Sequence, residues 1–224
     1  MNNKRFETII ELLGKNGTVA DIGCDHGKMS AYIASNGLAK HVYATDISLS
    51  SLNKARALYK TLENVEFVLG DGFSCLPQKP DAAIVAGMGG ETIAKMLTND
   101  NAKTTLVLQP MKDSDILYKA LYENDYKIEK VKIAREDRRY YEIIRASFQG
   151  CKTNKFNFLY PPLDALVADD DSLGFFEREI KILSRAAKGA ELGDNVRFNE
   201  LSAQLDLLNE VIKNVKSKRC NSHN

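Results

Sequence analysis

The chain has 224 residues, of which 44% are hydrophobic and 27% are charged, and its formal net charge is +1. These values are close to those of ordinary globular proteins and exclude a disordered or fibrous chain. The length suits one domain with an appendage, or two small domains, and we expect a core that folds by itself. The nearly balanced charge lacks the basic excess that would by itself indicate a nucleic-acid partner.

The sequence contains no apolar run of the roughly 18 residues that a membrane-spanning helix requires. Residues 1–5 lead into an amphipathic segment and not into the apolar core of a secretion signal. The four cysteines lie far apart and form no Cys-x-x-Cys pair: Cys24, Cys75, Cys151 and Cys220. This spacing argues against a metal site and against a disulfide framework, and it favours a cytoplasmic protein.

Hydrophobic periodicity predicts alternating strands and helices over the first 122 residues. Strands are expected over 18–22, 41–44, 65–69, 81–85 and 105–108. Helices are expected over 6–13, from the turn after the first strand to about 36, from the capping residue Ser48 to about 62, and over 91–97 and 116–122. Such alternation predicts a parallel sheet with helices on both faces.

Two further β-rich segments, 126–134 and 140–148, follow the alternating region. Only about five residues, 135–139, connect them, which is too short for a parallel crossover. We therefore expect these two strands to pair antiparallel. The predicted fold class is α/β, with a doubly wound, mostly parallel sheet that ends in an antiparallel pair.

The pattern changes after residue 149. Apolar residues recur at four-three spacing over 176–190 and again over 201–215, which predicts two helices that form an antiparallel hairpin of coiled-coil type. We therefore divide the chain into a sheet domain, 1–149, and a helical hairpin domain, 150–224. The tail from Lys216 onward is expected to be frayed.

The segment Asp21-Ile22-Gly23-Cys24-Asp25-His26-Gly27 lies between the first strand and the next helix. Gly23 and Gly27 permit a tight turn and close approach of a ligand to the backbone, and the helix presents free N–H groups. The spacing Gly-x-x-x-Gly differs from the dinucleotide fingerprint, and Asp25 places a negative charge where a pyrophosphate would lie. The turn therefore favours a cationic or zwitterionic ligand.

Acidic residues also follow the second and third strands. Asp46, next to Ile47, stands where an acid can accept both hydroxyl groups of a ribose. Asp71, within Gly70-Asp71-Gly72, is suited to accept an adenine amino group. Each acid alone is an ordinary turn residue. Three of them at successive strand ends meet at one crevice and together predict a site for S-adenosylmethionine (SAM).

Four sets of residues occur together in this chain: Asp21-Ile22-Gly23-x-Asp25-His26, Ala86-Gly87-Met88-Gly89-Gly90, Leu108-Gln109-Pro110-Met111, and Glu136-Asp137 followed by Tyr141-Glu142-Ile143-Ile144. Their combination resembles the bacterial tRNA (adenine(22)-N1)-methyltransferase family over roughly residues 4–149, and the C-terminal hairpin matches that family's usual appendage. One segment departs from the family. Members of the family commonly have Ala-Tyr-Leu-Pro after the Asp-His pair, whereas this chain has Gly27-Lys28-Met29-Ser30.

The resemblance implies a Rossmann-like, class I SAM-dependent methyltransferase that modifies N1 of adenine 22 in the D-loop region of tRNA. A ring nitrogen carries a free lone pair, so in-line positioning can replace a general base. Amino-group methyltransferases commonly have Asn-Pro-Pro-aromatic or Asp-Pro-Pro-aromatic after the fourth strand, whereas Ala86–Gly90 offers no side-chain amide. Asp25 and Met88 are the residues expected to position the base, through charge and through an adaptable thioether.

The predicted site follows from these assignments. The residues expected to bind SAM are Asp21, Gly23, Cys24, Asp25, His26, Asp46, Ile47, Asp71, Gly72 and Gly87. Those expected to contact tRNA are Arg5, Lys28, Arg135, Arg138 and Arg139, because basic side chains can follow RNA phosphates. The helical hairpin is expected, from the resemblance, to help hold the tRNA.

Plainer interpretations stand beside these assignments. His26 can simply begin a helix, Cys24 can be a small turn residue, Met88 can belong to the core, and residues 136–139 can be a solvated turn. The hairpin domain has 11 basic and 11 acidic residues, as a solvated coiled coil would. A SAM-dependent methyltransferase with a small-molecule substrate is one alternative function. A non-enzymatic adaptor is another, against which the intact acids of the predicted site argue.

Overall fold

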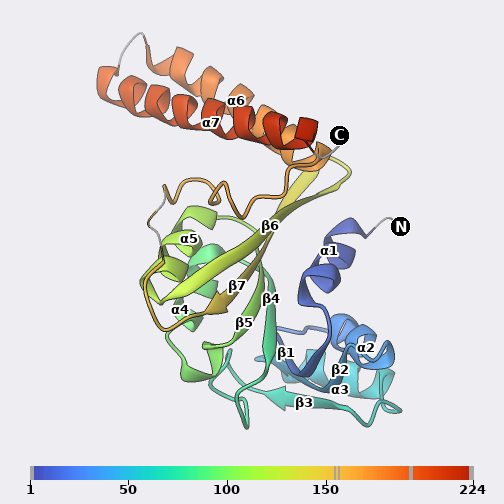
Figure 1. The fold of residues 1–224 in the computed structure, drawn as a ribbon. Helices are drawn as coiled ribbons and strands as arrows, with labels where there is room; N and C mark the ends of the chain where they lie inside the picture. The colour runs from blue at the N-terminus through green and yellow to red at the C-terminus, as the bar shows by residue number, and fades with distance from the viewer. Residues whose placement is uncertain (1–2, 154, 156, 192–193, 222–224) are drawn as a thin grey trace.

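A sheet of seven strands, in the order β3-β2-β1-β4-β5-β7-β6, forms the centre of the protein. The computed structural model describes residues 3–153, 155, 157–191 and 194–221 (Figure 1). The strands are β1 (Asn16–Ile22), β2 (Ala39–Asp46), β3 (Val65–Leu69), β4 (Ala82–Met88), β5 (Thr105–Pro110), β6 (Tyr126–Glu136) and β7 (Arg139–Phe148). Neighbours among β1 to β5 are parallel, and β7 is antiparallel to both β5 and β6. The predicted sheet, including its antiparallel pair, is confirmed.

Helices cover both faces of the sheet because alternate strand residues point to opposite sides. Val19 and Ile84 pack with α1 and α2 in one apolar cluster, whereas Ala20 and Val85 pack with α4 and α5 in another. The helices are α1 (Lys4–Leu13), α2 (Lys28–Ser35), α3 (Leu49–Leu58), α4 (Gly90–Met96), α5 (Ser114–Glu123), α6 (Asp170–Ala190) and α7 (Asn195–Asn221), with a short 3-10 helix over Asp100–Ala102.

The helices α6 and α7 form the predicted hairpin, which projects from the end of the sheet where β6 and β7 turn (Figure 1). Its base is tied to the sheet. Phe176 and Leu208 are fully buried in the same apolar cluster as Val131 of β6. The backbone of Val131 also donates a 2.9 Å hydrogen bond to the Ala165 carbonyl and accepts one of 2.9 Å from Val167. The core is therefore continuous across residue 150, and the division into 1–149 and 150–224 stays a prediction.

Three boundaries differ from the sequence-based prediction. β4 continues through Met88, so part of the expected glycine loop is strand. The connection between β6 and β7 is a tight turn over residues 137–138, which is shorter than expected. α7 extends to Asn221, and Lys218 Nζ bonds the carbonyl of Leu163, so the expected fraying does not begin at residue 216. Among the residues described, no helix is long and apolar enough to cross a membrane.

Candidate functional site

A cavity of about 380 Å³ opens at the carboxyl ends of β1 and β4, under the beginning of α1. Parallel strands place their carboxyl ends at one edge, which is where open α/β sheets bind ligands. The cavity is lined by eight of the residues predicted from the sequence: Arg5, Asp21, Gly23, Cys24, Asp25, His26, Lys28 and Gly87. The structure thus brings together residues from three separate segments.

The turn between β1 and α2 is held in shape by its neighbours. Gly27 has φ +70°, and a Cβ there would lie 3.0 Å from the Phe67 ring and 3.1 Å from Ala55, so both conformation and space require glycine. The backbone N–H groups of Gly23 and Cys24 donate to the Thr45 carbonyl at 2.8 and 2.9 Å. These contacts fix the turn against the end of β2.

Asp25 and Asp46 are joined at the mouth of the cavity. Asp46 Oδ2 accepts a 2.9 Å hydrogen bond from the Asp25 backbone, and Oδ1 accepts one of 2.8 Å from the backbone of Ser48. His26 Nδ1 lies 2.7 Å from Asp25 Oδ2, and that hydrogen bond lowers the pKa of Asp25. Asp25 therefore stays ionised at neutral pH. Each oxygen of Asp46 keeps a lone pair for a further donor.

Asp21 is the buried acid of the site, with 5% of its surface exposed. Ser30 Oγ donates a 2.5 Å hydrogen bond to Asp21 Oδ2. Burial raises the pKa of Asp21 to about 6, despite that hydrogen bond. A carboxylate removed from water is costly to ionise unless a positive charge joins it. This position is therefore suited to a cationic ligand.

Cys24 and Met88 take structural positions. Cys24 is 8% exposed and packs against Ala44 and Leu52, and burial raises the pKa of its thiol, so it stays protonated at neutral pH. This geometry agrees with the plainer interpretation of Cys24 as a turn residue. Met88 ends β4, and its methyl carbon would lie 2.2 Å from a Cβ at Gly23. Its side chain supports the glycine turn and packs on the core. A role for Met88 in positioning a base stays a prediction.

The other predicted cofactor residues lie beside the cavity and not in its lining. Asp46 is next to the turn after β3, since the backbone of Gly70 donates to the Asp46 carbonyl at 3.1 Å. Asp71 and Gly72 belong to that turn. Ile47 is 75% exposed at the end of β2. These residues follow β2 and β3, at the same edge of the sheet as the cavity.

The ends of β4 and β5 are bound to each other. Met111 donates its backbone N–H to the Met88 carbonyl, and Gly90 donates to the Lys112 carbonyl, both at 2.8 Å. A Cβ at Gly90 would lie 2.0 Å from the carbonyl oxygen of Asp113. The glycine-rich motif after β4 and the proline-containing motif at the end of β5 therefore pack against each other as one unit.

Arg5 has contacts that the sequence did not predict. Its Nη1 donates to Gln109 Oε1 at 3.2 Å, and its guanidinium lies 5.0 Å from the centre of the Tyr141 ring. The Arg5 backbone also donates to Glu136 Oε1 at 2.9 Å. Arg5 thus joins α1 to two of the four sets of residues that carry the resemblance. Gln109 and Tyr141 were missed as site residues, although both stood in the motifs that carried the resemblance.

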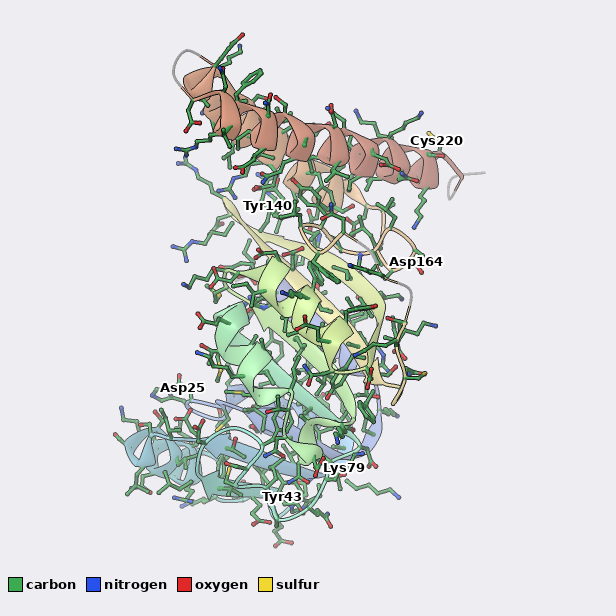
Figure 2. The ribbon with its side chains drawn as sticks, turned by 90° about the vertical axis from the view of Figure 1, so that its left-hand side faces the viewer. Asp25, Tyr43, Lys79, Tyr140, Asp164 and Cys220 are labelled. Atoms are coloured by element: carbon green, nitrogen blue, oxygen red, sulfur yellow. The ribbon has the colours of Figure 1, made fainter. Side chains whose placement is uncertain are left out.

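The remaining basic residues fall into two groups. Lys28 is exposed beside the cavity, with Nζ 5.7 Å from the centre of the Phe6 ring. Arg135, Arg138 and Arg139 are exposed at the β6–β7 turn, near the hairpin. The Arg135 backbone donates to Asp171 Oδ2 of α6 at 3.1 Å. In Figure 2 Tyr140 lies next to the hairpin, far from Asp25 at the cavity. Any RNA that contacts both groups must extend along the protein.

The described part of the chain holds no cluster of three or more His, Cys, Asp or Glu side chains that could bind a metal ion. The plainer interpretation of residues 136–139 as a solvated turn agrees with the exposure of residues 137–139. His26 lies just before α2 and contacts Asp25, so it takes part in the turn as well as lining the cavity. The roles of all these side chains toward a ligand stay predictions.

Comparison with known proteins agrees with this geometry. The tRNA (adenine(22)-N(1))-methyltransferase of Bacillus subtilis is 27% identical over 94% of this chain and 96% of its own length. A Mycoplasma pneumoniae relative is 32% identical, but the match spans only 62% of its length and 56% of this chain. The crystal structure of the B. subtilis M1A22 tRNA methyltransferase TrmK has a TM-score of 0.80, at 24% identity over 93% of this chain and 97% of that one.

The structure of M. capricolum TrmK in complex with S-adenosylhomocysteine has a TM-score of 0.82, at 20% identity over 96% of this chain and 99% of that one. These similarities confirm the fold and the resemblance found in the motifs. A family model described as "Methyltransferase domain" matches residues 2–144, which is more than half of the chain. The protein therefore belongs to this methyltransferase-domain family.

Proposed function

We propose that the protein is a SAM-dependent methyltransferase that acts on N1 of an adenine in tRNA, at position 22, in the cytoplasm. The observation that carries this proposal is the alignment with the B. subtilis adenine-22 enzyme, which extends over 94% of the chain and includes the hairpin. A small-molecule methyltransferase would have no use for basic residues beside a hairpin remote from the cavity. The tRNA substrate is therefore favoured over that alternative.

The residues at the strand ends fit SAM. When bound, SAM supplies a methyl group carried by a cationic sulfonium. Asp21 offers a carboxylate whose pKa is raised by burial and which a cationic ligand would stabilise in its ionised form. Asp46 retains acceptor capacity for ribose hydroxyls, and Asp71 lies on the adjoining turn, where it can accept from adenine. Ile47 presents an exposed apolar surface on which a flat ring can pack.

The protein has little proton chemistry to perform on an adenine ring nitrogen. The N1 lone pair is free at neutral pH, so the site must hold N1 in line with the methyl group and exclude other orientations. The methylated base is cationic. Asp25, whose pKa is lowered, is an ionised group at the mouth of the cavity that can stabilise this charge. Arg5 lines the same cavity, and its hydrogen bond to the buried Gln109 holds it in place.

We assign the hairpin and the β6–β7 turn to tRNA binding. α7 has 27 residues and thus a length of about 40 Å, which is comparable with the arm of a folded RNA. Arg138 and Arg139 are exposed where this hairpin meets the sheet. Contacts at the hairpin would hold the body of the tRNA while the D-loop region reaches the cavity.

Incubation with tritiated SAM tests the proposal. An unmodified tRNA transcript should take up label, and digestion followed by mass spectrometry should identify 1-methyladenosine. A matched transcript with guanine in place of adenine 22 should remain unlabelled. Uptake of label by the matched transcript would refute position 22 as the site of methylation. Label in a panel of small metabolites, with none in tRNA, would establish the small-molecule alternative.

A further inference from the structure

A groove of about 720 Å³ lies between α1 and α2, next to the cofactor cavity. Asn3, Phe6 and Lys28 line both the groove and the cavity. The groove and the cavity therefore share a wall. A polymeric ligand, such as a nucleic-acid strand, that places one residue in the cavity brings the neighbouring residue to the groove.

Aromatic side chains form the floor of this groove. The rings of Phe6 and Tyr32 meet edge to face, with centroids 5.1 Å apart. Tyr32 is 43% exposed and Phe6 is half-buried, so part of each ring surface is open to a ligand. Tyr59 lines the groove as well. Aromatic surfaces of this kind stack on the bases of single-stranded nucleic acid, because every base has a flat apolar face.

The charges around the groove differ between its two sides. Lys28 lies at the border with the cavity, 5.7 Å from the Phe6 ring. Glu11, on the other side, is neutralised by Lys132, whose Nζ lies 2.8 and 2.6 Å from its two oxygens. Glu7 is exposed on the same helix and repels anions. A phosphate is therefore favoured on the Lys28 side, which faces the cavity.

We propose that this groove binds the base of an unpaired nucleotide that neighbours the target adenine, with the base stacked on Phe6 and Tyr32 and the intervening phosphate near Lys28. The inference rests on the proposed function, since it assumes that the target adenine occupies the cavity. N1 lies on the pairing edge of adenine, so the base must leave its stack before it can be methylated. Its neighbour then loses a stacking partner, and the two rings of the groove replace that partner.

A single introduced fluorophore can detect the stacked base, because the natural chain has no tryptophan. In the variant Tyr32→Trp, unmodified tRNA and a short single-stranded RNA should both quench the indole emission. The control is Phe148→Trp, which lines a different cavity beside Thr104, at the end of β7 that lies away from the hairpin and at the opposite edge of the sheet from the cofactor cavity. Its emission should not change. Unquenched emission of the Tyr32→Trp variant, while filter retention shows that the RNA is bound, would overturn the proposal.

Kinetics with matched variants give a second test. Tyr32→Leu removes the ring and keeps an apolar side chain, so the Michaelis constant for tRNA should rise about five- to 150-fold, the range expected for one lost base-aromatic stack. Tyr32→Phe keeps the ring, and its Michaelis constant should stay close to that of the natural protein. Tyr32 lines the groove and is absent from the lining of the cofactor cavity, so the dissociation constant of SAM, measured by calorimetry, should be equal in all three proteins. A joint loss of SAM and tRNA binding in Tyr32→Leu would overturn the assignment of this ring to the substrate.

The outcomes separate the two proposals. If the natural protein methylates tRNA and Tyr32→Leu does so with an unchanged Michaelis constant, the groove does not bind the substrate and the proposed function stands. If the natural protein methylates no tRNA, the proposed function fails. The quenching of Tyr32→Trp by single-stranded RNA then still decides whether the groove binds a nucleotide, since that measurement requires no methyl transfer.

Discussion

Asp21→Asn keeps the shape of a buried side chain at the cavity and removes its ability to ionise. Asp21 is almost fully enclosed, and burial raises its pKa to about 6. If SAM places positive charge in the cavity, the pKa of Asp21 should return toward 3.8, the ordinary value. Binding then expels a proton from every molecule in which Asp21 is protonated.

The two pKa values set the size of the effect. With a pKa of about 6 in the free protein and about 4 in the complex, SAM affinity should fall roughly tenfold between pH 7 and pH 5, which corresponds to about 1.4 kcal/mol. The stability of the free protein changes in the same range. Because the folded-state pKa is raised, protonated Asp21 favours the folded state. The free energy of unfolding should therefore decrease, by up to about 3 kcal/mol, as pH rises from 4 through 6.

Calorimetric titration with SAM from pH 5 to pH 8 measures this dependence, and buffers of different ionisation enthalpy measure the released proton. The natural protein should release close to one proton near pH 5 and almost none at pH 8. Asp21→Asn should bind SAM more weakly at pH 7, with no pH dependence between 5 and 7, and should be more stable than the natural protein when free. The assignment of this pH dependence to Asp21 would be refuted by either of two results. One is a tenfold change in SAM affinity between pH 7 and pH 5 that persists in Asp21→Asn, and the other is a SAM affinity of the natural protein that does not vary with pH.

Three further perturbations test other parts of the site. Asp46→Ala should abolish most of the SAM-induced rise in melting temperature and lower the stability of the free protein by about 1–2 kcal/mol, since two hydrogen bonds to its carboxylate are lost; an unchanged rise would place the cofactor elsewhere. Arg138→Ala and Arg139→Ala should each reduce the log–log salt slope of tRNA binding by roughly 0.7 to 0.9 without altering SAM affinity; a fixed slope would assign both arginines to the fold alone. Deletion of residues 150–224 should abolish tRNA methylation while SAM binding remains, and should lower the melting temperature because the apolar cluster crosses that boundary; full activity of the shortened protein would exclude a tRNA-holding role for the hairpin.

Local patterns predicted most of the fold because the central strands β1, β2, β4 and β5 are short and largely buried and α1 is strongly amphipathic. Ser48 caps α3 as expected, since its Oγ accepts from the Ser51 backbone. The errors arose where tertiary contacts decide a boundary. β4 continues through Gly87 to Met88 because Met88 pairs with Pro110 of β5, across a register shift at Gly87, and nothing in their own sequence indicates a strand. The end of α7 is held by contacts of Lys218 with residues more than fifty positions away.

The candidate site was predictable where a motif encodes a local shape, as in the turn from Asp21 to Gly27. It was less predictable where α1 approaches the sheet. The predicted phosphate contact of Arg5 stays a prediction, and its contacts with Gln109 and Tyr141, over a hundred residues away, were not foreseen. Phe6 fitted the apolar face of a helix, and its exposure to both cavities depends on where that helix begins. Apolar residues at a spacing of 3.6 identify the apolar face of a helix, but they do not identify the strand or helix that packs against this face.

The paired ends of β4 and β5 restrict how this protein could acquire a new target atom. Each strand end supplies a carbonyl that the other's backbone N–H requires, and the space at Gly90 is taken by the Asp113 carbonyl. An Asn-Pro-Pro-aromatic segment grafted after β4 would bring side chains, and prolines without N–H groups, into that contact. Residues 110–113 would have to be exchanged at the same time. The two segments must therefore be exchanged together. Substitutions made one at a time in either segment would not convert the site to the methylation of an amino group.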